Sequence, residues 1–178
     1  MAADNSAAAE KAKQIRLLIL DVDGVMTDGR LYFSAEGELL KVFNILDGQG
    51  IKLLRASGVE VAIITGRRAA ALEKRAADLG IRHLYQGRED KLNALDELLA
   101  QLHLEYHQVA HLGDDLPDLP VIKRVGLGMA VANAYTLVKE QADWCTHTQG
   151  GSGAVREACD FIMAAQGTLE GALQSFLK

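Results

Sequence analysis

Two aspartates one residue apart, Asp21 and Asp23, directly follow the apolar run Leu17–Leu20, and Gly24 comes next. Alternate side chains of an extended chain share a face, so the two carboxylates start out pointing the same way. The carboxyl ends of strands are where open α/β sheets bind their ligands. Taken alone, these residues fit a ligand site no better than a simple turn at Asp23-Gly24, in which Asp21 is the capping residue. Polar residues at the ends of later strands would favour the ligand site over the turn.

Polar residues recur at the ends of later predicted strands and at the start of one predicted helix. They are Thr65, Lys91, Asp114, Asp115 and Asp118. Each has an ordinary structural interpretation on its own, as a helix cap, a surface lysine, or a turn or helix-start acid. Their recurrence at one edge of a parallel sheet favours a common site.

The acidic residues of this set need a counter-charge. Two carboxylates about 6 Å apart repel by about 3 kcal/mol at an effective dielectric constant of about 20. Several of them at one sheet edge would cost much of a domain's marginal stability. A divalent cation and a lysine would remove that cost, and aspartate oxygens without a His or Cys partner favour Mg²⁺. A magnesium ion, a carboxylate, a hydroxyl and a lysine together suit phosphoryl transfer.

The elements that must position these residues alternate between strand and helix. Apolar runs predict strands over 15–20, 59–64, 82–85, 109–112 and 125–130, with an edge strand near Trp144. Helical patterns occupy 48–57, 69–79, 89–102, 118–124, 135–141, 154–165 and 169–177. This alternation predicts an α/β fold with a parallel sheet and helices on both faces.

Three segments depart from the alternation. Residues 28–44 predict a β-hairpin whose apolar side chains are too many for a lone exposed hairpin, which indicates packing on another subunit. Residues 1–14 are Ala-rich and polar, and predict a flexible arm, frayed or partly helical, before a single domain over 15–178. The glycine run 150–153 predicts a flexible hinge in a C-terminal segment that spans 150–178.

The strand-end residues resemble the four motifs of the haloacid dehalogenase superfamily of phosphatases, in the same order. The motifs are Asp21-Val22-Asp23-Gly24-Val25, Ile64-Thr65-Gly66, Lys91, and Gly113-Asp114-Asp115 with Asp118. Further segments are similar to the family of 3-deoxy-D-manno-octulosonate 8-phosphate (KDO 8-phosphate) phosphatases, namely 28–32, 43–48, 63–67, 83–87 and 153–157. The resemblance implies a Rossmann-like fold. The short gaps after the first two motifs indicate that it is capless.

This resemblance implies a role for each motif residue. Asp21 is the expected nucleophile, which becomes a transient aspartyl phosphate, and Asp23 is the expected proton donor and acceptor. Mg²⁺ is expected to bind the Asp21 carboxylate, the Asp23 backbone carbonyl and Asp114. Thr65 and Lys91 are expected to hold phosphoryl oxygens.

Further residues are expected around this centre. Asp115 and Asp118 should orient Lys91 or a metal-bound water. Arg67 and Arg75 should bind the carboxylate and phosphate of the substrate, because guanidinium groups bind such oxygens in pairs. The spacing of the two arginines, about two helical turns, allows both to face one cleft, although a solvated Arg75 stays an alternative. Contacts to the sugar are implied for Asn44, Ile45, Leu46, Asp47, Gly48, Lys52 and Gly66.

The function implied by the resemblance is magnesium-dependent hydrolysis of KDO 8-phosphate in the biosynthesis of the lipopolysaccharide inner core. The expected assembly is a homotetramer in which the C-terminal segment contacts a neighbour's site. A phosphatase for a nine-carbon, sialic-acid-type sugar 9-phosphate is the alternative that the catalytic motifs do not separate from it. A receiver-like signalling domain is a more distant alternative, since the third predicted strand, 82–85, ends without an aspartate.

Composition agrees with a small-molecule enzyme. The net charge is −5 and no long basic tract occurs, so nucleic acid is not an expected partner. No apolar run is long enough for a membrane span or a signal peptide, which predicts a cytoplasmic protein. The two cysteines, Cys145 and Cys159, are expected to be free thiols. Structural roles are expected for His103, His107 and His111.

Overall fold

The computed structural model describes residues 5–177, whose centre is a six-stranded sheet in the order β5-β4-β1-β6-β7-β8. All neighbouring strands in this sheet run parallel. The strands are β1 (Leu17–Leu20), β4 (Glu60–Thr65), β5 (His83–Gln86), β6 (Val109–Gly113), β7 (Leu127–Ala130) and β8 (Trp144–Cys145). The predicted parallel sheet is confirmed.

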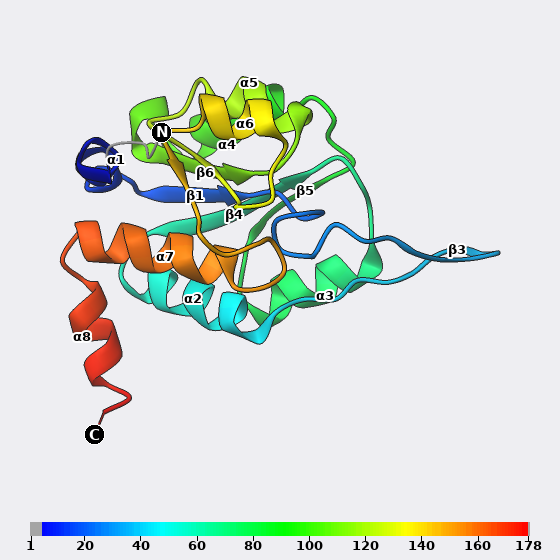
Figure 1. The fold of residues 1–178 in the computed structure, drawn as a ribbon, viewed down its shortest axis with the longest axis horizontal. Helices are drawn as coiled ribbons and strands as arrows, with labels where there is room; N and C mark the ends of the chain where they lie inside the picture. Colours follow the sequence, from blue (N-terminus) through cyan, green and yellow to red (C-terminus); the bar gives the residue numbers. More distant parts are fainter. Residues whose placement is uncertain (1–4, 178) are drawn as a thin grey trace.

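Helices cover both faces of the sheet, as predicted (Figure 1). One face carries α4 (Lys91–Leu102), α5 (Leu119–Ile122) and α6 (Thr136–Gln141), and the other carries α2 (Ile45–Ala56), α3 (Ala70–Asp78) and α7 (Ala154–Ala165). Two 3-10 turns, η1 (Tyr106–Gln108) and η2 (Leu116–Asp118), flank β6. No helix within residues 5–177 is long and apolar enough to cross a lipid bilayer.

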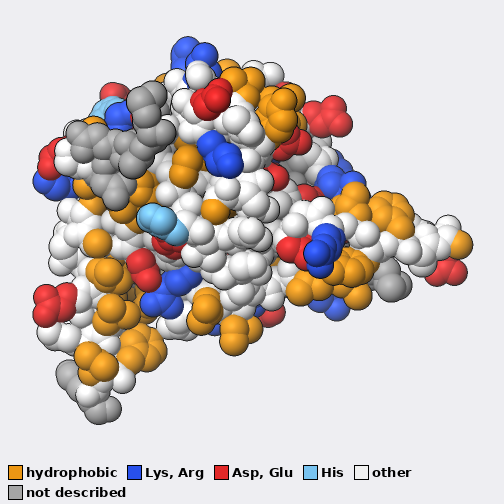
Figure 2. Space-filling model, viewed as in Figure 1, with side chains coloured by type: hydrophobic (Ala, Val, Ile, Leu, Met, Phe, Trp, Pro, Cys, Tyr) orange, Lys and Arg blue, Asp and Glu red, His pale blue; other side chains and the backbone are white. Residues whose placement is uncertain are grey.

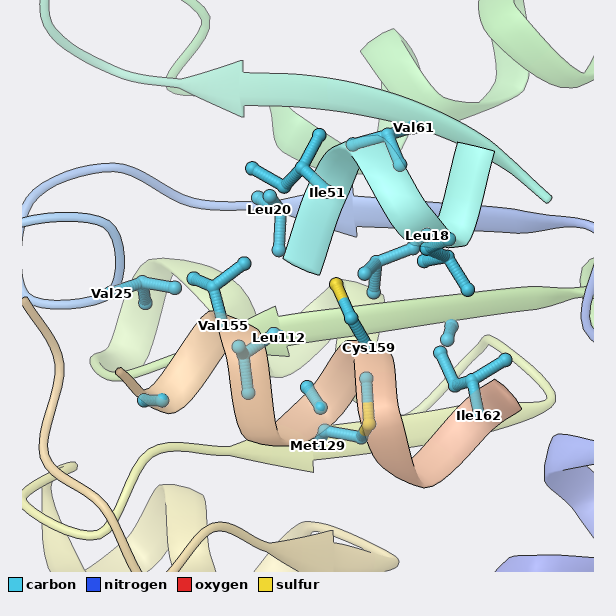
Figure 3. Close-up of a cluster of buried hydrophobic side chains, with 14 of the residues drawn as sticks. Leu18, Leu20, Val25, Ile51, Val61, Leu112, Met129, Val155, Cys159 and Ile162 are labelled. Carbon is cyan, nitrogen blue, oxygen red and sulfur yellow. The ribbon is translucent and has the colours of Figure 1, made fainter. Parts of the chain in front are cut away.

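The central strand β1 is buried along its whole length, because both of its faces are covered. Leu18 and Leu20 point into the layer formed with α2 and α7, where they meet Ile51 and Val155 (Figure 3). The alternate residues, Leu17 and Ile19, join the cluster beneath α4. Each fully buried leucine contributes about 1.5–3 kcal/mol. This packing fixes the end of β1, and therefore the place of the first motif.

The predicted hairpin consists of β2 (Tyr32–Ser34) and β3 (Gly37–Leu40), which pair antiparallel. It projects away from the sheet as a narrow arm (Figure 1). Apolar side chains are exposed along it (Figure 2): Leu31, Tyr32, Phe33, Leu40 and Val42. The hairpin itself is confirmed, and its packing on another subunit stays a prediction.

The predicted arm is helical over residues 5–12, as one alternative allowed, but it is packed against the domain and is not a free arm. Helix α1 (Asn5–Ala12) packs against α7 and buries Ala8 and Ala12. The Gln166 side chain donates hydrogen bonds to the carbonyls of Ala12 and Ile15 at 3.1 and 2.7 Å. A small methyl group every fourth residue is enough of an apolar face where a neighbouring helix approaches closely. Residues 1–4 of the predicted arm lie outside the described residues.

The predicted hinge at residues 150–153 is also wrong, because these glycines are packed against the loop that follows β1. A Cβ atom on Gly150 would lie 1.7 Å from the carbonyl oxygen of Gly24, and one on Gly151 would lie 2.4 Å from the Asp28 nitrogen. The amide of Gly151 donates to the Val25 carbonyl at 3.0 Å. The glycines permit close approach of two backbones. Helix α7 then belongs to the core, and only α8 (Leu169–Gln174) extends away from it (Figure 1).

Candidate active site

Three aspartates meet at the carboxyl ends of the two central strands. Asp21 follows β1, Asp114 follows the neighbouring β6, and Asp118 lies in η2. Carboxylate oxygens from the three lie within 4.8 Å of one another. Burial, together with the charges of Asp21 and Asp118, raises the pKa of Asp114 to about 8. Within residues 5–177, Asp114 Oδ1 is buried without a hydrogen-bond partner. The structure therefore brings these strand-end acids together, and one of their buried oxygens accepts no hydrogen bond from residues 5–177.

Lys91 is buried among these acids and is not the surface lysine of the alternative interpretation. Its Nζ lies 2.9 Å from Asp21 Oδ1 and 2.7 Å from Asp118 Oδ1, and its side chain is 5% exposed. Burial would lower the pKa of Lys91, but the two carboxylates outweigh it and raise this pKa. Burial and the nearby Asp118 raise the pKa of Asp21, although Lys91 opposes them. The first residue of α4 thus supplies a permanent positive charge beside Asp21.

Asp118 is held by His111, for which the sequence predicted only a structural role. This histidine is fully buried on β6, and its Nε2 lies 2.9 Å from Asp118 Oδ1. Burial would raise the pKa of Asp118, but its contacts with His111 and Lys91 outweigh it and hold this pKa below its usual range. His111 therefore helps to fix the carboxylate that orients Lys91. Its position on a buried strand next to the motif Gly113-Asp114 was the available sequence signal.

Asp115 and Asp118 were expected to play the same part, but they make different contacts in the structure. Asp118 Oδ2 accepts hydrogen bonds from the amides of Asp114 and Asp115 at 3.0 and 3.3 Å, which fixes the loop after β6. Asp115 is exposed, and its side chain accepts from the Leu116 amide at 2.8 Å as the N-cap of η2. This capping interaction engages the Asp115 carboxylate within its own turn, so Asp118 is the residue that contacts Lys91, and orientation of a metal-bound water by Asp115 stays a prediction.

Thr65 is the last residue of β4 and is buried beside β1. Helix α3 begins five positions later, with Ala69 as its N-cap residue. The interpretation of Thr65 as the cap of that helix is therefore wrong. A buried hydroxyl at the edge of the sheet agrees with the predicted position of this motif.

Asp23 lies in a cluster of alternating charges at the base of the hairpin. Lys41 Nζ lies 2.5 Å from Asp23 Oδ1 and 2.8 Å from Glu38 Oε1. Arg67 completes the cluster, with Nη2 3.1 Å from Glu38 Oε2 and Nε 3.6 Å from Asp23 Oδ2. Burial would raise the pKa of Glu38, but Lys41 and Arg67 outweigh it and lower this pKa. The sequence analysis placed Arg67 at the site but missed Glu38 and Lys41.

Most of the predicted sugar-binding residues lie at the start of α2, whereas Lys52 lies further along this helix and Gly66 follows β4. Asn44 caps this helix by accepting the Leu46 amide at 2.8 Å, so the helix begins before the predicted Gly48. Arg75 Nη2 donates to the Asn44 carbonyl at 3.2 Å, and a Cβ on Gly48 would lie 2.4 Å from that nitrogen. Arg75 thus lies against the first turn of α2 and is not a solvated helix residue. Exposed members of the set are Ile45, Leu46 and Lys52, whereas Gly66 is partly buried.

The Asp47 carboxylate has a structural role that its segment did not predict, and its sugar contact stays a prediction. It is buried, and its Oδ1 accepts the amide of Arg156 in the first turn of α7 at 2.9 Å. The residue before that helix is Gly153, which offers no side-chain cap. Burial raises the pKa of Asp47 to about 6, although the Arg156 amide opposes the shift. Asp47 therefore serves as the helix cap of α7, supplied from α2.

Asp47→Asn tests this structural role. The folded-state pKa of about 6 exceeds the ordinary value of 3.8, so ionisation costs stability as pH rises from about 4 through 6. The asparagine keeps an acceptor for the Arg156 amide but does not ionise. We expect the variant to gain up to about 3 kcal/mol relative to the native chain between pH 4 and 7, in urea unfolding. Asp78→Asn, at an exposed position of α3, should show no such trend. A large rise in KM for Asp47→Asn would instead favour the sugar contact.

Known proteins are similar to this chain in sequence and in fold. Residues 83–158 match the model of a haloacid dehalogenase-like hydrolase family. The chain is 57% identical over 163 residues to the 3-deoxy-D-manno-octulosonate 8-phosphate phosphatase KdsC of Yersinia pestis, covering 92% of this chain and 87% of that protein. The chain belongs to the KDO 8-phosphate phosphatase family.

Solved structures of this family agree with the fold. A probable yrbi family phosphatase from Pseudomonas syringae is 61% identical, with a TM-score of 0.96 and coverage of 97% of this chain and 98% of that one. The Moraxella catarrhalis KDO 8-phosphate phosphatase, solved with a magnesium ion, a phosphate ion and a KDO molecule, is 41% identical. Its TM-score is 0.92, with 95% of this chain and 97% of that chain covered. Neither the nine-carbon nor the receiver alternative is favoured by these relatives.

Proposed function

We propose that this protein is a magnesium-dependent phosphatase that hydrolyses KDO 8-phosphate to KDO and phosphate. One observation carries the chemistry: Asp21 and Asp114 end neighbouring strands, and the Lys91 ammonium lies between Asp21 and Asp118. This arrangement places a carboxylate nucleophile beside a fixed positive charge, as transfer of an anionic phosphoryl group requires. Membership of the family supplies the substrate class.

In the first step, an oxygen of the Asp21 carboxylate attacks phosphorus, and the bond between phosphorus and the sugar oxygen breaks. Asp23 gives its proton to that sugar oxygen, which leaves as an alcohol. The product on the enzyme is an aspartyl phosphate. Lys91 stays within ion-pair distance of Asp21 and offsets charge on the phosphoryl oxygens, while the buried Thr65 hydroxyl offers a hydrogen bond to them.

In the second step, the Asp23 carboxylate takes a proton from a water molecule whose oxygen attacks the same phosphorus. The bond between phosphorus and the Asp21 oxygen breaks, so phosphate leaves and both aspartates return to their starting states. One residue thus donates a proton in the first step and accepts one in the second. Because Asp23 already lies in the site, neither step needs a base from solution, and the entropic cost of positioning one is avoided.

The site fits a magnesium ion. The Asp21 carboxylate, the Asp23 backbone carbonyl and Asp114 would hold it, and hard oxygen donors are what Mg²⁺ prefers. Asp114 Oδ1 has no hydrogen-bond partner among residues 5–177, whereas both oxygens of Asp118 are engaged by Lys91, His111 and two amides. When bound, the ion supplies positive charge that stabilises the transferring phosphoryl group.

Phosphate release from two purified sugar phosphates tests the assignment. With Mg²⁺ present, we expect a clear preference in kcat/KM for KDO 8-phosphate over a nine-carbon sialic-acid-type 9-phosphate. Removing divalent cations with EDTA should abolish turnover, and added Mg²⁺ should restore it. A preference for the nine-carbon substrate would reject the proposed substrate. Undiminished release in EDTA would reject the metal dependence.

The exposed hairpin supports a homotetramer in which hairpins of different subunits pack together. Its apolar side chains would otherwise stay in water, as the exposed fractions of 61% for Phe33 and 53% for Val42 indicate. Helix α8 and the residues after it expose Leu173, Phe176 and Leu177, which suits the proposed contact of the chain end with a neighbour's site. Light scattering on the same preparation should give the mass of four chains, and a monomer would contradict the proposal.

A phosphatase that releases KDO belongs to the synthesis of the lipopolysaccharide inner core, and we place it there. The small-molecule substrate and the absence of a membrane-spanning helix among residues 5–177 are compatible with a cytoplasmic enzyme. Nucleic acid is not a proposed partner, because the net charge of −5 disfavours it.

A further inference from the structure

Lys41 is a buried cation that the mechanism above does not use. It directly follows β3, at the base of the hairpin, and its side chain is 3% exposed. Lysine is seldom buried to this degree unless it is paired. Here it is paired twice, with Asp23 Oδ1 at 2.5 Å and Glu38 Oε1 at 2.8 Å. Lys41 of the hairpin therefore forms an ion pair with the carboxylate of Asp23, the proposed proton donor.

The two oxygens of Asp23 are not equivalent in this arrangement. Oδ1 accepts the hydrogen bond from Lys41, whereas Oδ2 is buried without a hydrogen-bond partner within the described part of the chain. The Arg67 Nε atom lies 3.6 Å from Oδ2, beyond hydrogen-bond distance. Of the two oxygens, Oδ2 is therefore the one whose hydrogen-bonding capacity is unused by residues 5–177.

Glu38 completes the support for Lys41. It accepts from Lys41 through Oε1 and from Arg67 through Oε2, so each cation is held by two carboxylates. Two acids and two bases leave the cluster of Asp23, Glu38, Lys41 and Arg67 with no net formal charge. Lys41 is therefore fixed from the hairpin side as well as from the Asp23 side, and it cannot follow Asp23 if that side chain rotates.

We infer that Lys41 is a positioning residue for proton transfer: it occupies Asp23 Oδ1 and so presents Oδ2 to the leaving oxygen of the substrate. The hairpin then has a part in the reaction itself in addition to its proposed part in assembly. This inference rests on the proposed role of Asp23 as the proton donor.

Lys41→Met tests the inference by removing the ammonium group while keeping most of the apolar stem. The readout is the rate of the first step with two leaving groups, in rapid-quench experiments with Mg²⁺ present. A primary alkyl phosphate has a poor leaving group that needs a proton, whereas p-nitrophenyl phosphate releases a stable phenolate that does not. We expect the first step to slow by about 10²-fold for the alkyl phosphate, since general acid catalysis contributes about 10² to 10⁴. The burst of p-nitrophenol should change by less than about threefold, well below that range.

Three further variants complete the experiment. Lys41→Arg keeps a cation between Asp23 and Glu38 and should recover most of the loss with the alkyl phosphate. Lys13→Met, at a surface lysine paired with Glu10, should match the native chain with both substrates. Lys41→Gln leaves a polar group between the buried carboxylates, and it carries the same leaving-group comparison if Lys41→Met does not fold.

Equal slowing with both leaving groups would overturn the inference, because a general disturbance of the site has no leaving-group preference. Unchanged rates with both would overturn it as well. A native enzyme that hydrolyses the alkyl phosphate but not KDO 8-phosphate would contradict the proposed substrate and leave this comparison intact. Failure of the proposed substrate and failure of the inferred role of Lys41 therefore give different results.

Discussion

Asp21→Asn should lower turnover of KDO 8-phosphate by about four orders of magnitude or more, because removing a catalytic nucleophile has effects of this size or larger. An asparagine amide has the shape of the carboxylate, but it cannot attack phosphorus to give an acyl phosphate. The measurement is phosphate release with Mg²⁺ at saturating substrate. Retained activity would remove Asp21 from its role as the nucleophile.

The same variant should keep its fold, which separates a chemical effect from a structural one. The pKa of Asp21 is raised, chiefly by burial, so its ionised form costs stability above its ordinary pKa of 3.8. The amide removes that cost but also removes one partner of Lys91, whose second partner, Asp118, stays at 2.7 Å. We expect a free energy of unfolding within about 1 kcal/mol of the native value, measured in urea. The mass by light scattering should be unchanged.

Gly150→Ala should have the largest effect on stability among simple substitutions near the site. The added methyl group would lie 1.7 Å from the carbonyl oxygen of Gly24, which is a backbone atom of the first motif and cannot move aside cheaply. Gly150 also donates its amide to the Asn133 side chain at 2.9 Å, which holds this close approach in place. We expect a loss of about 3 kcal/mol or more in urea unfolding, at or beyond the upper end for overpacking.

Gly171→Ala is the matched control for that substitution. Gly171 lies within α8, and a Cβ atom there meets nothing within 4 Å. Alanine in a helix should be neutral or stabilise it by up to about 1 kcal/mol. If Gly150→Ala unfolds at the same urea concentration as the native chain, the glycine run does not act through close packing and the predicted hinge returns as an interpretation.

The catalytic motifs could be predicted from the sequence because each is a local pattern at the end of an apolar run. Parallel strands bring their carboxyl ends to one edge, so Asp21 and Asp114 meet although 93 positions separate them. Lys91 was placed at the site by its position among the strand-end acids and by its resemblance to a motif, although a lysine at a helix start is ordinarily exposed. Its burial follows from the two carboxylates that face it.

The residues that the sequence did not reveal act through contacts between distant segments. Lys41 in the hairpin reaches the carboxylate of Asp23, which follows β1. Asp47 also has a contact that its segment did not predict, because its carboxylate caps α7 from α2, while its sugar contact stays a prediction. The glycines at 150–153 look flexible in isolation, and only the approach of Gly24 gives them a packing role. Such pairings leave no periodic pattern in either segment.

The most direct test of the central claim is chemical trapping of the phosphorylated residue. The native enzyme is mixed with KDO 8-phosphate and Mg²⁺, stopped with acid during turnover and reduced with borohydride, which converts an aspartyl phosphate to homoserine. Mass spectrometry of the peptide that contains residue 21 should show homoserine at that position, and only when substrate was present. Homoserine at another aspartate, or an unmodified Asp21 under conditions of full turnover, would contradict the account.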